Sequence, residues 1–256
     1  MKAVLKYPGA KWRISEWIIS HFPEHKVYCE PFFGSGAVFF NKPQTYIETI
    51  NDIDGNIVNL FKVCRDNPEE LARLIEFTPF AREEFENCYD KSDDSIEQAR
   101  RTLVRYHQSF GTSNSSKKSW RNVQTYGGPR TATMWNYLPG RIAEVCKRLK
   151  EAQIENIDAI ELIRRYNDEN TLLYCDPPYL QSLRKKNIYS CELSEEYHIN
   201  LLSVLKESKS KIVLSGYDSQ LYNSMLSGWN TDEKQTTAQM GKHRVEKIWL
   251  NFEEVQ

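Results

Sequence analysis

The sequence predicts an α/β fold, in which a mixed sheet with helices on both faces is interrupted by an inserted, mostly helical domain. Short apolar strands alternate with helical segments on both sides of a basic region, residues 111–139, which has neither period. The final two strands, at 229–235 and 245–252, have no helix between them, so we expect an antiparallel hairpin in a mixed sheet. The 256 residues are enough for one large domain with an insertion.

In the first part of the chain, each of two strands is followed by a helical segment. The strand at 26–30 leads through a glycine-containing turn to a short helix at 37–40. The strand at 45–50 precedes a segment whose apolar residues recur with helical spacing. Asn67 and Pro68 then indicate a helix start, as cap and first-turn proline. Further helices are expected at 81–89 and 95–110.

Beyond the basic region, strands and helices alternate again. The expected elements are helices at 141–150 and 194–207 and strands at 153–156, 171–175 and 211–215. We therefore assign residues 1–60 and 150–256 to the α/β domain and residues 61–149 to the inserted domain.

Charge is polarised along the chain, although the net charge is only −1. Between residues 66 and 97 eleven acids face three basic residues, whereas between 100 and 150 eleven basic residues face one acid. One basic region in a nearly neutral protein fits a polyanion as partner.

The six cysteines are scattered, with no Cys-x-x-Cys pair. Residues 1–13 carry lysines and a proline without an apolar core, and no apolar run approaches a membrane-spanning length. We expect free thiols in a reducing cytoplasm, with neither a disulfide framework nor a zinc site. The histidines form no spaced ligand set, so no metal is expected.

The most informative segment is Asp176-Pro177-Pro178-Tyr179, which directly follows the apolar strand at 171–175. Proline donates no backbone hydrogen bond and favours an extended preceding residue, so the chain leaves the sheet in a rigid turn. That turn presents a carboxylate at its start and an aromatic ring at its end, which suits a planar substrate bearing an amino group. Alternatively, Asp176 caps a turn and Tyr179 packs in the core.

Other candidate ligand-binding residues lie at two more strand ends and at the N-terminus. Gly34 and Gly36 let the backbone bend sharply and approach a ligand, but the third glycine of the dinucleotide fingerprint is absent. Asp52 can accept hydrogen bonds from both hydroxyls of a ribose; alternatively, it caps the next helix. Lys6 and Lys11 flank a Pro-Gly turn and could clamp a carboxylate, although solvated lysines are commoner.

Taken in order, five strings resemble the Dam-like adenine-specific DNA methyltransferases: KYPGAK from residue 6, EPFFGSG from 30, NDID from 51, YCDPPY from 174 and LSGYDSQLY from 214. The resemblance covers nearly the whole chain and is weakest at 79–135. It implies a Rossmann-like methyltransferase sheet and S-adenosylmethionine as methyl donor. It also implies a target-recognition domain inserted between NDID and DPPY.

The resemblance implies a set of cofactor-binding residues: Tyr7, Lys11, Glu30, Phe33, Gly34, Gly36, Asp52, Ile53, Ile157, Asp158 and Asp176. In this set, Glu30 and the glycines surround the methionine portion of the cofactor. Asp52 holds the ribose, and Ile53 covers one face of the cofactor adenine.

The implied catalytic residues are Asp176, Pro177, Pro178 and Tyr179. The amino nitrogen of adenine is a poor nucleophile because its lone pair is delocalised into the ring. If the Asp176 carboxylate and the Pro177 carbonyl each accept one amino hydrogen, electron density returns to the nitrogen. The methyl group then passes in line from the sulfonium, without a metal or a covalent enzyme intermediate. Pro178 would keep the turn rigid, and Tyr179 would stack on a base turned out of the duplex.

Basic and aromatic residues near 117–137, and a second basic run after DPPY, are the expected contacts with double-stranded DNA. Cationic side chains suit phosphates or guanine edges, asparagine suits adenine, and Trp120 or Tyr126 could wedge into the base stack. For each residue alone, a solvated loop is the alternative. The set is Lys117, Lys118, Trp120, Arg121, Asn122, Tyr126, Arg130, Arg184, Lys185 and Lys186.

The sequence therefore predicts a monomeric, cytoplasmic, site-specific enzyme that methylates the exocyclic amino nitrogen of adenine in duplex DNA. The DPPY turn activates an exocyclic amine without dictating the base, so methylation of cytosine, or of adenine in RNA, stays open. A catalytically inactive DNA-binding relative is the alternative from another class, and the intact DPPY turn argues against it. The recognition sequence, and whether the enzyme is solitary, phage-encoded or paired with a restriction nuclease, do not follow from the sequence.

Overall fold

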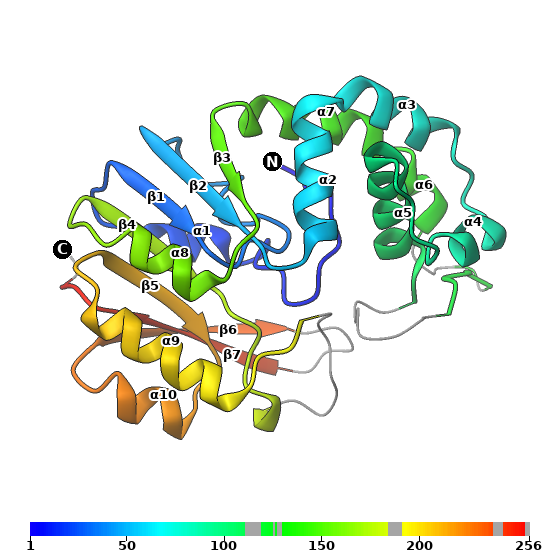
Figure 1. The fold of residues 1–256 in the computed structure, drawn as a ribbon. Helices are drawn as coiled ribbons and strands as arrows, with labels where there is room; N and C mark the ends of the chain where they lie inside the picture. The colour runs from blue at the N-terminus through cyan, green and yellow to red at the C-terminus, as the bar shows by residue number, and fades with distance from the viewer. Residues whose placement is uncertain (111–118, 125, 127–129, 184–190, 238–242, 254–256) are drawn as a thin grey trace.

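The computed structural model describes residues 1–110, 119–124, 126, 130–183, 191–237 and 243–253. Within these residues, one seven-stranded sheet has the order β3-β2-β1-β4-β5-β7-β6 (Figure 1). The strands are β1 (Val27–Glu30), β2 (Ile47–Asn51), β3 (Ala152–Glu155), β4 (Thr171–Cys175), β5 (Lys211–Gly216), β6 (Asn230–Thr237) and β7 (His243–Leu250). The first five are parallel, and β7 is antiparallel to both β5 and β6. The mixed sheet with a C-terminal hairpin is confirmed.

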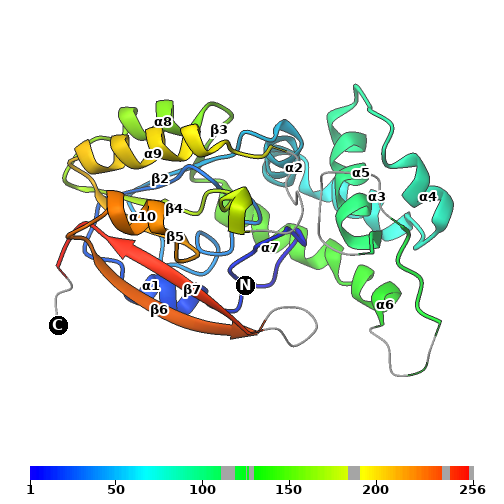
Figure 2. The same cartoon turned by 90° about the horizontal axis from the view of Figure 1, so that it is seen from below.

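Helices cover both faces of this sheet, as predicted. On one face lie α8 (Ala159–Arg165), α9 (Glu195–Glu207) and α10 (Gln220–Met225), and α1 (Ser15–Ser20) lies on the other (Figure 2). Each face has its own apolar core: Leu173 and Trp249 belong to the first and Tyr174 and Ile248 to the second. Successive residues of one strand enter different cores because side chains alternate across a sheet. The predicted α/β architecture, a mixed sheet with helices on both faces, is confirmed.

A group of helices lies between β2 and β3 in sequence and beside the β3 edge of the sheet (Figure 1). It consists of α2 (Gly55–Asp66), α3 (Pro68–Phe77), α4 (Arg82–Asn87), α5 (Ser95–Gln108), α6 (Thr131–Trp135) and α7 (Leu138–Leu149). The helices expected at 81–89 and 95–110 are present with slightly shorter bounds. The region 111–139 was expected to lack a helical period, yet it contains α6 and the start of α7. Five residues are too few for a period to show, and Pro139 lies in the first turn of α7, where proline is tolerated.

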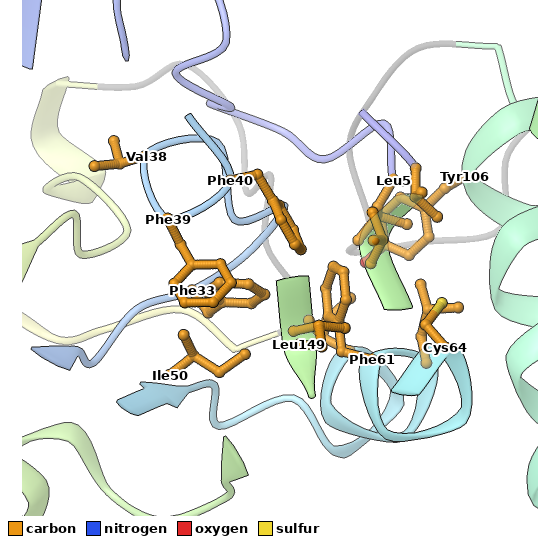
Figure 3. Packing of buried hydrophobic residues seen from close by; sticks show 14 of the residues in the cluster. Leu5, Phe33, Val38, Phe39, Phe40, Ile50, Phe61, Cys64, Tyr106 and Leu149 are labelled. Carbon is orange, nitrogen blue, oxygen red and sulfur yellow. The ribbon is translucent and has the colours of Figure 1, made fainter. Parts of the chain in front are cut away.

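Helix α2 packs against residues of the sheet region and against the other helices of this group. Phe61 and Cys64 of α2 share one core with Phe33, Phe40 and Leu5 (Figure 3). The expected domain boundary at residue 60 falls inside α2, whose helical hydrogen bonds continue to Asp66. The division into domains therefore stays a prediction.

A buried charge cluster fixes the last helix of this group to the sheet. Glu48 of β2 accepts hydrogen bonds from Arg148 of α7 and from Lys42, whose Nζ lies 2.5 Å from Glu48 Oε1. Both cations pair with the same carboxylate, and such pairing is the condition for burying ions at tolerable cost. In the part of the chain that the structure describes, no helix is long and apolar enough to cross a membrane.

Candidate active site

A cavity of about 260 Å³ opens where β1, β2 and β4 end. Ligands of open α/β sheets bind at the carboxyl ends of the strands, near the point where the strand order reverses. Here that point lies between β1 and β4, because the chain runs outward from β1 to β3 and then returns to β4. The cavity is lined by residues from six stretches of chain: 7–11, 30–38, 51–54, 158–159, 174–178 and 191–197.

The turn after β1 depends on two glycines with positive φ. Gly34 has φ +51° and Gly36 has φ +66°, in the left-handed region that residues with a Cβ avoid. A Cβ on Gly34 would lie 2.9 Å from Cδ1 of Tyr7, so the glycine also permits close approach of the N-terminal segment. The helix expected at 37–40 is wrong: these residues form turns, closed by a hydrogen bond from Phe40 N to Gly36 O.

Asp52, at the end of β2, is buried and already bound to backbone amides. Its Oδ2 accepts from Gly34 N at 2.8 Å, and its Oδ1 accepts from Asp54 N at 2.9 Å. Burial raises the pKa of this carboxyl to about 6, against the opposing effect of the amides. The helix cap considered for Asp52 is supplied by Asp54, whose side chain accepts from Asn56 N. Asp52 is thus left facing the cavity.

Glu30, the last residue of β1, lines the cavity beneath this turn. Its Oε2 accepts a hydrogen bond from the Tyr28 hydroxyl at 2.6 Å. Burial raises the pKa of Glu30 to about 8. An acid with such a pKa gains most from a cationic ligand, since the ligand's charge would stabilise the ionised form.

The carboxylate of Asp176, directly after β4, has two side-chain partners. Lys11 Nζ lies 2.8 Å from Asp176 Oδ2, and Ser215 Oγ of β5 donates to Asp176 Oδ1 at 2.8 Å. The Lys11 side chain is almost fully buried and also donates to the Gly9 carbonyl at 3.0 Å. Lys11, assigned from the resemblance to the cofactor, is therefore paired with the acid of the DPPY turn.

Tyr179 is buried beside the same ammonium. Lys11 Nζ lies 4.8 Å from the centre of the Tyr179 ring, and the hydroxyl donates to Glu246 Oε2 of β7 at 2.6 Å. The ring also meets Tyr217 edge-on, with 4.4 Å between ring centres. Of the four residues of the DPPY turn, Asp176 and Pro178 line the cavity, whereas Pro177 and Tyr179 are not among its lining residues.

At the far end of the cavity lie Ile53, half of whose surface is exposed, and Asp158. Asp158 Oδ1 accepts from backbone amides at the start of α8, and its Oδ2 accepts from the Tyr197 hydroxyl at 2.8 Å. Tyr197, from α9, also lines the cavity but was not predicted from the sequence. It looks like an ordinary aromatic in the first turn of an amphipathic helix, so nothing in the sequence distinguishes it.

The cavity brings together nine of the residues expected to bind the cofactor: Tyr7, Lys11, Glu30, Phe33, Gly34, Asp52, Ile53, Asp158 and Asp176. Gly36 and Ile157 lie behind its wall. Gly36 shapes the turn, while Ile157 exchanges hydrogen bonds with the Asn51 amide and so joins two strand ends. Among the described residues, no group of three or more His, Cys, Asp or Glu side chains is arranged to hold a metal ion.

Residues 7–240 match the family model of the D12 class N6 adenine-specific DNA methyltransferases. The chain belongs to this family. A DNA adenine methylase of Haemophilus influenzae is 24% identical over 88% of this chain and 82% of the relative. The Salmonella typhi DNA adenine methylase is 24% identical over 96% of this chain and 87% of the relative. A type II methyltransferase of Lactococcus lactis, M1.LlaDCHI, is 25% identical over 94% of this chain and 90% of the relative.

The predicted family and enzyme class, adenine-specific DNA methyltransferase, are thus confirmed. Among solved structures, the Escherichia coli candidate methyltransferase yhhF is similar with a TM-score of 0.40 and 10% identity, over 96% of this chain and 90% of that one.

Of the D12 methyltransferase's expected DNA-binding residues, half lie within the described structure. Trp120 is half-buried: it packs against Phe80, donates to Gln108 Oε1 at 3.2 Å and has the Arg82 guanidinium over its ring. Tyr126, by contrast, is fully exposed. The others described are Arg121, Asn122 and Arg130, whereas Lys117, Lys118, Arg184, Lys185 and Lys186 lie outside the described residues.

Lys6 lies near two arginines, Arg121 and Arg141, and this group of positive charges was not predicted from the sequence. Burial and the nearby Arg121 and Arg141 guanidinium groups lower the pKa of Lys6 to about 8. Cationic groups that act on one another in this way would be stabilised by an anion bound between them. Arg141 also donates to the Ala3 carbonyl at 2.8 Å, which holds the N-terminal segment against α7.

Proposed function

We propose that the protein transfers the methyl group of S-adenosylmethionine to the exocyclic amino nitrogen of an adenine flipped out of duplex DNA. The observation that carries this proposal is one cavity lined by Asp176 together with Glu30 and Asp52. The cavity thus combines an acceptor for an amine, Asp176, with polar residues suited to a nucleoside that carries an amino-acid tail. The family match supports the choice of adenine in DNA.

At the cofactor end, the residues fit a nucleoside joined to an amino acid. Asp52 would accept from the ribose hydroxyls, Ile53 would cover the purine, and Glu30 would face the α-ammonium group. When bound, S-adenosylmethionine supplies an electrophilic methyl group on a sulfonium. The positive φ of Gly34 keeps the backbone close enough to line this cavity without a side chain in the way.

At the base end, the Asp176 carboxylate and the Pro177 carbonyl would accept the two hydrogens of the target amine. Lys11 holds Asp176 Oδ2 at 2.8 Å, so an incoming amine has to displace this ammonium or use Oδ1, which Ser215 occupies. The Tyr179 ring would stack on the base. These side chains raise the electron density on the nitrogen and fix its direction of attack.

Double-stranded DNA would lie across the N-terminal segment and the helical part of the molecule. Lys6, Arg121 and Arg141 would contact phosphates, and protonation of Lys6 would rise on binding. Trp120 is held by its packing, so the fully exposed Tyr126 is the better candidate for the wedge that enters the base stack. A monomer acting in the cytoplasm remains part of the proposal.

Cofactor binding should strengthen as pH rises from about 5.5 to 8. Burial gives Glu30 a pKa of about 8 and Asp52 a pKa of about 6, so both bind protons below those values. The α-ammonium group needs Glu30 ionised, and each proton that must be released weakens binding up to about tenfold per pH unit below its pKa. Isothermal titration calorimetry in buffers of different ionisation enthalpy would count the released protons. Glu30→Gln should remove the dependence between pH 6 and 8, and an unchanged profile would contradict the assignment.

The proposed function is tested by measuring methyl transfer from labelled S-adenosylmethionine to three substrates. These are unmethylated duplex DNA, a duplex in which one region of one strand contains no adenine, and RNA. Mass spectrometry of the hydrolysed product would identify the base. N6-methyladenine in duplex DNA is the expected product. Methylated cytosine or RNA would replace the proposal with one of the alternatives, and absence of cofactor binding would favour an inactive DNA-binding relative.

A further inference from the structure

A buried glutamate outside the cavity touches two residues of the base end. Glu246 Oε2 accepts the Tyr179 hydroxyl at 2.6 Å and lies 3.9 Å from Lys11 Nζ. Glu246 is 9% exposed and, like Tyr179, is not among the residues that line the cavity, whereas Lys11 is, so Glu246 would act on a ligand through its contacts with these two side chains.

The position of Glu246 on β7 explains why its carboxylate reaches the DPPY turn. In the β5–β7 ladder, Gly216 pairs with Lys247, so Glu246 lies just beyond the paired end of β5, level with the strand-end turns. Side chains alternate along β7, so Glu246 faces the same side as Ile248, which shares a core with Tyr174 of β4. Asp176 lies two residues beyond Tyr174. The first half of the antiparallel strand β7 thus places Glu246 on the same side of the sheet as Asp176.

A carboxylate in this place is costly unless it is paired and hydrogen-bonded. Apolar residues follow it at Ile248 and Leu250, and the partners that satisfy it are the phenol and ammonium of the base end. The neighbouring Val245 is exposed, so this strand exposes an apolar side chain while it buries an acidic one. The burial of the acid is therefore tied to the site.

We propose that Glu246 is a positioning residue that fixes the position of the Tyr179 ring, on whose face the target adenine stacks. The proposal rests on the proposed function of the cavity. The hydroxyl bond to Glu246 and the edge contact with Tyr217 restrain the ring from two sides. When other contacts already hold the stacking ring in place, binding of the base does not have to restrict its motion. Misplacement of a reacting group by about 1 Å can lower the rate a hundredfold.

The test compares Glu246→Ala, Glu246→Gln, Tyr179→Phe and the double variant Glu246→Ala/Tyr179→Phe. Tyr179→Phe keeps the ring and removes only the hydroxyl. We expect each of Glu246→Ala and Tyr179→Phe to lower kcat/KM for DNA about tenfold or more, and the double variant to lose no more than the worse single. Glu246→Gln retains an acceptor and should recover part of the loss. Cofactor affinity should stay within about twofold, because Glu246 does not line the cofactor end.

Glu233→Gln is the matched control, since Glu233 is an exposed acid of the same hairpin, 3.3 Å from Lys247. It should behave as wild type. Losses that multiply in the double variant, or equal losses in the Gln and Ala variants, would overturn the hydrogen-bonded positioning role. A Glu246→Ala protein with full activity would overturn it while leaving the proposed function intact. A wild-type protein that binds cofactor yet methylates no DNA would overturn both. Thermal midpoints separate these results from unfolding.

Discussion

Asp176→Ala should abolish methyl transfer, by at least about 10²- to 10³-fold in kcat, while cofactor affinity falls much less. The substitution removes the carboxylate that would polarise the target amine, an interaction that strengthens as the nitrogen becomes charged in the transition state. It also releases Lys11 and Ser215 from their common partner. The residues proposed to hold the ribose and the methionine part of the cofactor, Asp52 and Glu30, are at the ends of β2 and β1 and are unchanged in this variant. Single-turnover methylation of DNA and equilibrium binding of S-adenosylmethionine would measure the two effects separately.

Asp168→Ala is the matched control for this experiment. Asp168 is an exposed acid at the opposite end of β4, where its Oδ1 accepts from Asn170 N in a turn. Losing one exposed turn contact costs stability slightly and should leave turnover unchanged. If Asp176→Ala retains turnover near the wild-type rate, the assignment of the acceptor is wrong.

The sequence predicts which residues meet at the cavity where those residues follow strands. Glu30, Asp52 and Asp176 come at or directly after the ends of apolar strands, and parallel strands place their carboxyl ends at one edge of the sheet. Their meeting in one cavity therefore follows from three local patterns and one rule of topology. The glycine turn is also predicted from the local sequence, because a backbone position with positive φ favours glycine.

Contacts that depend on tertiary packing were not predicted. The pairing of Tyr179 with Glu246 joins residues 67 positions apart, and it depends on the register of the antiparallel strand β7. The resemblance assigns Lys11 to the cofactor and does not indicate its pairing with Asp176, which depends on the path of the N-terminal segment. Residues 37–40 are too few to decide between helix and turn, and packing of Phe39 and Phe40 into the core decides it.

Gly36→Ala should destabilise the protein by about 2–5 kcal/mol, which is a large share of the stability of a typical domain. Two costs add. A Cβ at φ +66° carries a conformational penalty of about 1–2 kcal/mol. The added methyl group would also lie 2.6 Å from Cε2 of Phe40 and still closer to the Phe33 ring, and overpacking a core costs about 1–3 kcal/mol. Urea unfolding followed by circular dichroism would give the difference in the free energy of unfolding.

Two other glycines separate these costs. Gly228 has φ +93°, and a Cβ added there would have nothing within 4 Å, so Gly228→Ala should show only the conformational penalty. Gly140 is exposed in α7, with a helical backbone and open space around it, so Gly140→Ala should stabilise by up to about 1 kcal/mol. The order of stability should be Gly140→Ala, wild type, Gly228→Ala, Gly36→Ala. If Gly36→Ala is no less stable than Gly228→Ala, the phenylalanines can move aside, and the turn over the cofactor end is less rigid than its packing indicates.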